Sequence, residues 1–277
     1  MMFDAYLKRW GLRADGDAIV TRSSCLLPVI WRDMPAMLKV AVEAEEKAGA
    51  LLMAWWDGEG AARVLALDGE ALLMERAQCR RSLVEMSRNG RDDEATRIIC
   101  EAMSRLHAPR AKAPPPLVLL EDWFRDLQPA AAAHGGVLAT CAATASMLLD
   151  SQRDKVVLHG DIHHANILDF GDRGWLAIDP KRLFGERGFD YANLFCNPTQ
   201  EIATAPAHFL RRLQLVASAA SLEPVRLLQW VLAWSGLSAA WFLAHGQSPE
   251  PSLTVARMAA ARLEHLGRIG TRGYRGH

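Results

Sequence analysis

The chain has 277 residues, half of them apolar, and its 32 lysines and arginines balance 32 aspartates and glutamates. This composition is ordinary for a globular protein and excludes a disordered or collagen-like chain. The balanced charge gives no reason to expect a nucleic acid or an anionic membrane as partner. The length is about twice the ~150 residues typical of one domain, so we expect two lobes or one large domain.

Cysteine spacing and hydropathy indicate the compartment. The five cysteines are an odd number, widely spaced and without a C-x-x-C pair, so we expect reduced thiols. The first residues, 1–10, resemble a short amphipathic helix and not a signal peptide. The most apolar stretch, 230–244, is shorter than the ~20 residues that span a bilayer, and we expect it to be a buried helix. These features favour a cytoplasmic protein.

The first quarter of the chain predicts a small antiparallel sheet with one helix. Short β-prone runs alternate with polar turns, and Asp68-Gly69 between two apolar runs is a strong hairpin signal. The segment Asp57-Gly58-Glu59-Gly60 is expected to end the helix. The expected elements are strands at 17–21, 25–31, 35–40, 63–67 and 71–74 and a helix at 43–56.

After Glu75 the apolar periodicity becomes helical, which predicts an α+β protein with a boundary near residues 75–80 and lobes at 1–77 and 78–277. We expect Asp92 or Asp93 and Ser221 to be N-caps. The glycine- and arginine-rich tail is expected to be flexible. The expected segments are helices at 95–106, 119–133 and 138–149, a helical region from 221 onward, and the tail at 270–277.

Residues 156–180 are the segment most informative about chemistry. The polar turn 171–174 has four residues on either side before Asn166 and Asp179 are reached, so a hairpin would place these two side chains opposite each other. Asp161 lies five residues upstream on a loop that reaches the same place. Carboxylate and carboxamide oxygens that converge in this way suit Mg²⁺.

Two other metal arrangements are less favoured by the same segment. Asp169-Phe170-Gly171 matches the metal-binding tripeptide of protein kinases, but the hairpin puts Asp169 on a strand, away from Asn166. The histidines at 159, 163 and 164 have no matching fourth ligand for zinc and lie among oxygen ligands. Asp179 is therefore the better candidate for a metal ligand.

The motif His-Gly-Asp-x-His-x-x-Asn, followed by Ile-Asp, resembles the catalytic segment of the aminoglycoside phosphotransferases and related small-molecule kinases. Within that family the longer match is similar to the streptomycin 6-phosphotransferases, and the similarity extends over most of the chain. The stretches that carry it are 158–180, 185–193, 33–40, 55–58 and 234–242.

The resemblance implies a two-lobed, protein-kinase-like fold with a small antiparallel-sheet N-lobe and a larger, mainly helical C-lobe. It further implies ATP and Mg²⁺ as cofactors. Asp161 would be the catalytic residue that orients the attacking hydroxyl and accepts its proton, while Asn166 and Asp179 would hold Mg²⁺ against the phosphates. Lys39 would bind phosphate, with Glu46, in preference to Glu43 or Glu45, as its partner.

The nucleotide-binding loop departs from the protein-kinase pattern. Thr21-Arg22-Ser23-Ser24 contains no glycine, although its backbone amides, with Ser23 and Ser24 at their centre, can cradle phosphates. Adenine is expected at 74–77, where the strand leaves the first lobe and where Glu75 and Ala77 offer their backbone.

Supporting roles are also predicted around the motif. Asp190 is expected to tether the catalytic loop by accepting hydrogen bonds from backbone or histidine donors. His159 and His163 are expected to orient that loop, and not to transfer protons. We expect the tryptophans at 230, 234 and 241 to belong to the core and not to a ligand platform.

The residues of the acceptor site are predicted from the charge of the acceptor. Streptomycin carries two guanidinium groups, for which we expect carboxylates in the pocket. After Asp190, however, four acidic residues face eight arginines. The candidates for negative charge around the cleft are Glu186 and Asp122, with Glu121 and Asp126 as neighbours of the latter.

These observations predict an ATP-dependent O-phosphotransferase that inactivates an aminoglycoside, with the 6-hydroxyl of streptomycin as acceptor. One alternative keeps the kinase and changes the acceptor to hydroxyurea or another small metabolite that bears a hydroxyl. Another is a non-catalytic nucleotide-binding module, and a third is a metal-dependent phosphohydrolase. The hydrolase leaves Lys39 unexplained.

Overall fold

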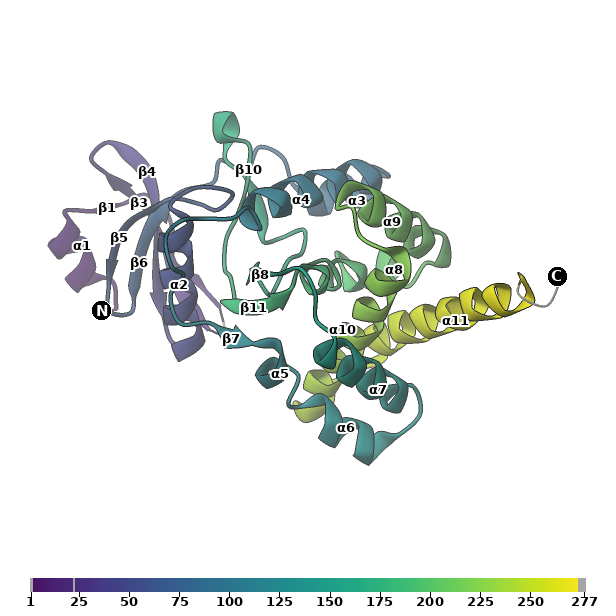
Figure 1. The fold of residues 1–277 in the computed structure, drawn as a ribbon. Coiled ribbons are helices and arrows are strands. Elements are labelled where there is room, and N and C mark those ends of the chain that lie inside the picture. Colours follow the sequence, from purple (N-terminus) through teal and green to yellow (C-terminus); the bar gives the residue numbers. More distant parts are fainter. Residues whose placement is uncertain (1, 22, 274–277) are drawn as a thin grey trace.

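The computed structural model describes residues 2–21 and 23–273 and divides them into a small sheet-containing part and a larger helical part (Figure 1). The sheet lies at the N-terminal end of the chain. The other end of the molecule is built by the helices α4 (Asp92–Leu106), α9 (Pro206–Ala219), α10 (Pro224–Ala244) and α11 (Glu250–Gly273). This is the predicted α+β, protein-kinase-like arrangement, which is confirmed.

The N-terminal sheet is antiparallel and has the order β1-β3-β4-β6-β5, with β2 paired to β3. The strand predicted at 17–21 is shorter in the structure, where only two of its residues pair with β3. Both are exposed, so no buried side chain stabilises a longer strand here. The strands are β1 Arg13–Ala14, β2 Ile19–Val20, β3 Ser24–Trp31, β4 Met34–Ala41, β5 Val64–Asp68 and β6 Ala71–Glu75.

Two helices flank this sheet. The first, α1 (Asp4–Trp10), packs apolar side chains against the sheet core and ends at Gly11 in the left-handed conformation. The second, α2 (Ala44–Trp56), lies between the sheet and the helical part. A Cβ at Gly49 would clash with the backbone of Pro180, so glycine is required where α2 passes that residue. This close approach brings α2 beside the candidate site.

The helical part follows the predicted periodicity with changes at the helix ends. The pattern at 119–133 forms two short helices. Arg91, and neither Asp92 nor Asp93, is the N-cap of α4, and Glu223 replaces Ser221 as the N-cap of α10 because its carboxylate accepts two backbone N–H groups. The helices are α3 Leu83–Arg88, α4 Asp92–Leu106, α5 Leu120–Trp123, α6 Leu127–His134, α7 Val137–Asp150, α8 Gln200–Ala203, α9 Pro206–Ala219, α10 Pro224–Ala244 and α11 Glu250–Gly273.

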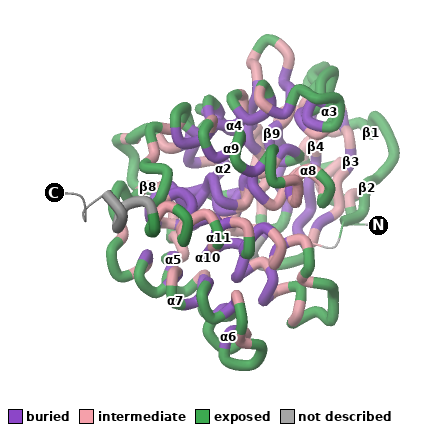
Figure 2. Tube along the Cα trace, turned by 90° about the vertical axis from the view of Figure 1, so that its right-hand side faces the viewer, coloured by how far each residue is buried: buried purple, intermediate pink, exposed green. Residues whose placement is uncertain are grey.

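The tail expected to be flexible is helical as far as Gly273, and residues 274–277 lie outside the described part of the chain. The most apolar helix, α10, runs through the main core. Its length and composition would suffice to cross a membrane, but 67% of its most apolar window is buried inside the protein. Figure 2 shows buried residues gathered in the interior and exposed ones on the outer turns of α6 and on β1. The prediction of a buried helix is confirmed.

Short strands connect the two parts. A three-stranded sheet has the order β7-β11-β8, and a separate hairpin pairs β9 with β10. The loop between β8 and β9 carries the catalytic motif. The elements are β7 Val118–Leu119, β8 Lys155–Leu158, β9 Ile167–Asp169, β10 Trp175–Ala177 and β11 Leu183–Glu186, with 3-10 turns η1 Gly171–Arg173, η2 Arg187–Tyr191 and η3 Asn193–Cys196.

Candidate active site

The loop between β8 and β9 is tied to η2 by one buried carboxylate. Asp190 accepts hydrogen bonds from the backbone N–H of His159 (2.8 Å) and of Gly160 (2.7 Å). It also accepts from Nε2 of His107 (2.9 Å). Three donors therefore compensate the burial of this charge. The predicted tethering role of Asp190 is confirmed.

His159 fixes the start of the same loop. Its ring is fully buried and stacks on Trp56, with the ring centroids 6.1 Å apart. Nε2 donates to the carbonyl of Ile178 (2.7 Å), and Nδ1 accepts from the backbone N–H of Asp161 (3.2 Å). Burial lowers the pKa of His159, which agrees with a neutral ring that donates through one nitrogen and accepts through the other. His159 thus joins the loop to the residue that follows β10.

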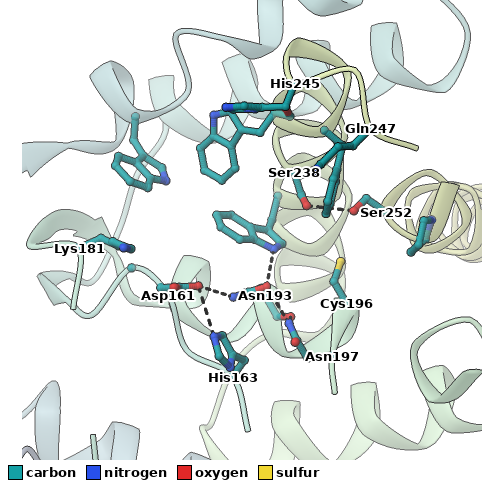
Figure 3. Close-up of a pocket in the computed structure, with 16 residues that line it drawn as sticks. Asp161, His163, Lys181, Asn193, Cys196, Asn197, Ser238, His245, Gln247 and Ser252 are labelled. Atoms are coloured by element: carbon teal, nitrogen blue, oxygen red, sulfur yellow. Dashed lines mark hydrogen bonds and ion pairs between the residues drawn. The ribbon is translucent and has the colours of Figure 1, made fainter. Parts of the chain in front are cut away.

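Asp161 is held from two sides. Nδ2 of Asn193 donates to Oδ1 of Asp161 (2.9 Å), and the Asn193 Oδ1 accepts from Nε1 of Trp234 (3.1 Å). Nδ2 of Asn166 donates to the Asp161 backbone carbonyl (2.8 Å) and lies 3.4 Å from its Oδ2. The Asp161 carboxylate therefore has a defined orientation at the edge of a cavity (Figure 3).

The hairpin after this loop is one residue out of the predicted register. Asn166 bonds to Ile178, because the Ile178 N–H donates to its carbonyl (2.9 Å), and not to Asp179. The cause is the turn: the Phe170 N–H donates to the Gly174 carbonyl around η1, so the turn has three residues, one fewer than the four predicted. Asp179 has φ of 66°, outside the strand conformation, so the pleat does not set its side-chain direction.

Lys39 joins the sheet to this hairpin. Its Nζ forms ion pairs with the carboxylates of both Glu46 and Asp179. Lys39 and Glu46 are buried, and Ser23 Oγ donates to the second oxygen of Glu46 (3.0 Å). Partial burial opposes the ionisation of Asp179, but the Lys39 ammonium outweighs it and holds the pKa of Asp179 below its ordinary value. The structure thus brings together the predicted lysine, glutamate and aspartate.

Asn166 and Asp179 provide a donor set that fits Mg²⁺. The amide nitrogen of Asn166 is committed to the Asp161 carbonyl, which leaves its Oδ1 as the ligand atom. Mg²⁺ is commonly bound by one or two protein oxygen ligands together with substrate phosphates and water. Within residues 2–21 and 23–273 no group of three or more His, Cys, Asp or Glu side chains has the geometry of a metal site. A magnesium ion bound with the nucleotide phosphates suits this pair.

The residues considered for other metals have different neighbours. Asp169 is buried on β9 and accepts a bidentate pair of hydrogen bonds from Arg81, at 2.9 and 3.0 Å. His164 is buried 3.7 Å from Asp92, whereas His163 lies at the cavity edge 4.0 Å from Asp161. Since His159 contacts Ile178, the three histidines do not converge.

A cleft of about 260 Å³ lies between the sheet, α2 and the end of the hairpin. One part is apolar and includes Met74, and the other part carries Lys39 and Asp179. Ser23 and Ser24 line its rim; Arg22 lies outside the described residues. The cleft is lined by Thr21, Ser23, Ser24, Leu26, Lys39, Glu46, Gly49, Ala50, Met53, Leu72, Met74, Ile178, Asp179 and Pro180.

The two residues predicted to flank adenine do not line this cleft with their side chains. The Glu75 carboxylate accepts from the Arg63 backbone N–H (2.6 Å) and pairs with Arg173, and the Glu75 N–H donates to the Arg63 carbonyl (3.0 Å). Ala77 packs against the small apolar cluster that contains Met74. Any contact of these residues with adenine would therefore involve their remaining backbone groups.

A larger cavity of about 530 Å³ lies on the other side of Asp161. Figure 3 shows Asp161, Asn193 and His163 on one side of it, with Ser238, Ser252, Gln247 and His245 across from them. It is lined by Trp123, Gly160, Asp161, His163, Lys181, Asn193, Cys196, Asn197, Trp234, Ser238, Trp241, Phe242, His245, Gln247, Pro251 and Ser252. A hydroxyl group bound here would lie next to the Asp161 carboxylate.

The predicted acceptor carboxylates are not in this cavity. Glu186 is buried elsewhere, where it accepts hydrogen bonds from Arg226 (2.6 and 2.9 Å) and from Trp230 Nε1 (2.8 Å). Its carboxylate is therefore paired with the partly buried Arg226. Asp122 is exposed on α5, and it is the adjacent Trp123 that reaches the cavity.

Two of the three tryptophans predicted in the core are buried there, Trp230 and Trp234, and Trp234 lines the cavity as well. Trp241 differs from the prediction, because it is only partly buried and lines the cavity. Sequence reasoning also missed Asn193, which lies one helical turn after Asp190. That spacing is a usable signal, because both side chains then reach the catalytic loop from the same turn. No comparable signal points to Trp123, which comes from a distant part of the chain.

Comparisons with known proteins agree with this geometry. Residues 9–246 match a family model described as aminoglycoside/hydroxyurea antibiotic resistance kinase. The chain is 51% identical to a streptomycin 3''-kinase from Klebsiella pneumoniae, over 87% of this chain and 92% of that protein. It is 31% identical to a streptomycin 6-kinase from Streptomyces griseus (81% and 76%) and 30% identical to a hydroxyurea phosphotransferase from Kitasatospora aureofaciens (93% and 77%).

Solved structures share the fold at low sequence identity. A thermostable mutant of the aminoglycoside phosphotransferase APH(4)-Ia, in a ternary complex with ADP and hygromycin B, superposes with a TM-score of 0.61 at 12% identity, covering 95% of this chain and 97% of that one. A choline/ethanolamine kinase family protein from Mesorhizobium loti gives 0.65 at 15% identity, covering 96% and 95%.

Proposed function

Because this chain belongs to the aminoglycoside/hydroxyurea antibiotic resistance kinases, we propose that it transfers the γ-phosphate of ATP to a hydroxyl group of streptomycin and thereby inactivates it. The observation that carries the proposal is the position of Asp161. Its oriented carboxylate borders the larger cavity, while Lys39 and Asp179 line the neighbouring cleft. An acceptor in one and a nucleotide in the other would meet at this loop.

In the proposed reaction the acceptor oxygen forms a bond to the γ-phosphorus, and the bond from that phosphorus to the β–γ bridging oxygen breaks, so that ADP leaves. Asp161 orients the hydroxyl and takes its proton, which then passes to solvent. Lys39, positioned by Glu46, neutralises phosphate charge. Mg²⁺, when bound by Asn166 and Asp179, would neutralise further charge on the phosphates.

The position of phosphorylation is the finer part of the proposal. The sequence motifs favoured the 6-hydroxyl, but the streptomycin 3''-kinase is 51% identical, whereas the two streptomycin 6-kinases are 31% and 27% identical. Identity of this size over most of both chains supports the 3''-hydroxyl, and we propose that position. The 6-hydroxyl is the competing outcome.

Hydroxyurea is the second candidate acceptor, supported by the 30% identity to a hydroxyurea phosphotransferase. The cavity argues against it. A volume of about 530 Å³ falls in the range of sites for drug-sized ligands, whereas hydroxyurea has five non-hydrogen atoms and would leave most of the space filled with water. A large acceptor uses the cavity better.

The test is a coupled ADP-release assay with Mg·ATP and, in parallel, streptomycin, hydroxyurea, kanamycin or no acceptor. We expect ADP release that depends on streptomycin, and NMR of the product distinguishes the 3''- from the 6-phosphate. Equal ADP release without any acceptor would indicate a phosphohydrolase. Absence of turnover together with retained ATP binding would indicate a non-catalytic nucleotide-binding module.

A further inference from the structure

The acceptor cavity has an aromatic corner made by Trp123 at the end of α5 and Trp241 on α10. Their ring centroids are 5.5 Å apart and their planes are inclined by 79°. Trp234 stands against Trp241 at the same distance, inclined by 80°. Edge-to-face packing of this kind sets ring faces at right angles, which is the arrangement of aromatic cages that bind organic cations.

We propose that this corner binds a guanidinium group of the acceptor through the ring faces of Trp123 and Trp241. The proposal rests on the proposed function in taking streptomycin as the acceptor. Both tryptophans are only partly buried, so part of each ring is available to a ligand in the cavity.

The charge of the cavity favours this mode of binding for a cation. Among the described residues that line it, Asp161 is the only carboxylate, and Lys181 adds a positive charge. Glu186, the carboxylate predicted for this task, is committed to Arg226. An acceptor with two guanidinium groups that presents a hydroxyl to Asp161 therefore finds no second carboxylate in the lining, and the ring faces offer attractive groups for its guanidinium groups.

Trp241 is electrostatically prepared for this role. Its Nε1 donates to Oδ2 of Asp126 (3.1 Å), a carboxylate that does not itself line the cavity. A hydrogen bond from the indole N–H to an anion increases the electron density of the ring and strengthens its attraction for a cation. Asp126 thus contributes negative charge to the cavity through Trp241.

The same type of contact recurs elsewhere in this chain. Among the described residues, guanidinium groups of the chain's own arginines lie over tryptophan rings in three places. The pairs and their distances from the guanidinium carbon to the ring centroid are Arg32 over Trp31 at 4.4 Å, Arg81 over Trp175 at 5.0 Å and Arg110 over Trp55 at 5.2 Å. Arg81 is also bound by Asp169, and Arg110 lies 3.6 Å from Glu59, so in these two places the ring face and a carboxylate contact the same guanidinium group.

The experiment combines a variant with a changed ligand. Streptomycin is compared with an analogue in which a neutral carbamoyl group replaces a guanidinium group, in wild type, Trp241→Leu and Trp241→Phe. We expect Trp241→Leu to raise the KM for streptomycin about tenfold and to leave the KM for ATP unchanged. The KM of Trp241→Phe for streptomycin should lie between those of wild type and Trp241→Leu. The preference of wild type for streptomycin over the analogue should largely disappear in Trp241→Leu.

Trp31→Leu, which removes an indole from the N-terminal sheet, is the matched control and should change neither KM. If Trp241→Leu raises the KM but keeps the full preference for streptomycin over the analogue, the proposal is overturned. The loss of affinity would then come from the smaller apolar contact area and not from a contact with the guanidinium group. If wild type does not phosphorylate streptomycin, the proposed function fails, and tryptophan fluorescence titration with streptidine, the diguanidino ring of streptomycin, still tests the corner. Binding that Trp241→Leu abolishes supports the proposal, and no binding to wild type overturns it.

Discussion

The nucleotide cleft and the acceptor cavity lie on either side of the same loop and are built from different chemistry. The cleft, of about 260 Å³, carries Lys39, which forms ion pairs with both Glu46 and Asp179. The cavity, of about 530 Å³, is lined mainly by indole rings, amides and hydroxyls, with Asp161 at its edge. In the proposed reaction, fixed charges serve phosphoryl transfer, whereas ring faces and shape select the acceptor.

This difference has an energetic consequence. Lys39 and Glu46 are buried and Asp179 is partly exposed, so removal of Lys39 or Glu46 leaves a charge uncompensated in a poorly solvated site, which is costly. Substitution of a ring or a hydroxyl in the cavity changes contacts without leaving a charge unpaired. The cleft should therefore tolerate little change, whereas the cavity can vary and keep the reaction.

The largest effect is expected at the loop shared by the two regions. Asp161→Asn keeps the shape of the side chain and removes the proton acceptor, so kcat should fall by about 10²–10⁴-fold. ADP-release kinetics measure kcat, and isothermal titration calorimetry measures the binding of Mg·ATP, which should change little. Asp172→Asn, the same change in the exposed turn η1, should leave kcat unaltered. Turnover near the wild-type rate in Asp161→Asn would contradict the mechanism.

The next effect tests the cleft alone. Lys39→Met removes the cation between Glu46 and Asp179, so kcat/KM for ATP should fall by about 10²–10³-fold, as for other groups that stabilise transferring phosphates. The binding of acceptor to the free enzyme, measured by calorimetry, should remain within about twofold. Lys47→Met, on the exposed side of α2, provides the control. An equal loss of acceptor affinity would show that the two regions are not separable.

A third prediction concerns the support beneath both regions. Arg212 donates to Asp92 and to the carbonyls of Leu194 and Asn197, each at 2.6 Å, and His164 of the catalytic loop lies beside this pair. Burial lowers the pKa of His164 to about 4, with a contribution from Arg212. Its separation of 3.7 Å from Asp92 exceeds hydrogen-bond length.

Because His164 binds a proton more weakly in the folded than in the unfolded state, stability should fall as pH falls from about 6.5 towards 4. Burial opposes ionisation of Asp92, but its partners hold its pKa below the ordinary value, so Asp92 stays charged in this window. Between pH 7.5 and 5, wild type should lose about 2 kcal/mol more unfolding free energy than His164→Gln. Urea unfolding followed by circular dichroism at both pH values measures the difference, and equal losses would refute it.

The two regions also differ in how far the sequence predicts them. The catalytic loop is tied to its partners by short or regular spacings, so Asp161, Asn166 and Asp179 were identified together. The prediction was wrong about the hairpin register, because hydrophobic patterning cannot reveal that Phe170 bonds to Gly174 and shortens the turn by one residue. The left-handed φ of Asp179 brings its carboxylate to Lys39 despite the changed register.

The acceptor cavity was predicted poorly because its walls come from separate elements. Trp123, Asn193 and Trp241 are brought together by the packing of α5, η3 and α10, and no local pattern encodes that packing. The prediction of carboxylates in this cavity depended on the rule that a cation pairs with an anion. Glu186 was predicted from its position beside the catalytic segment, and that position does not reveal its partner Arg226.

The smallest effect is expected at the contact that joins the aromatic cavity to the catalytic charge. Asn193 donates to Asp161 (2.9 Å) and accepts from Trp234 (3.1 Å) and from Asn197 (3.0 Å), so its amide has one orientation. Asn193→Ala should lower kcat about tenfold. The charged Asp161 carboxylate then loses the hydrogen bond from the Asn193 amide and gains rotational freedom. The KM for ATP should not change.

Asn197→Ala provides the graded control, since Asn197 acts on Asp161 only through Asn193 and its loss should lower kcat by less than Asn193→Ala does. Combining Asn193→Ala with Asp161→Asn measures their coupling: if Asn193 works through Asp161, the double variant should be no slower than Asp161→Asn alone. Additive losses would mean that Asn193 acts on the acceptor directly. Asn193 would then help to select the acceptor, and its hydrogen bond to Asp161 would not contribute to phosphoryl transfer.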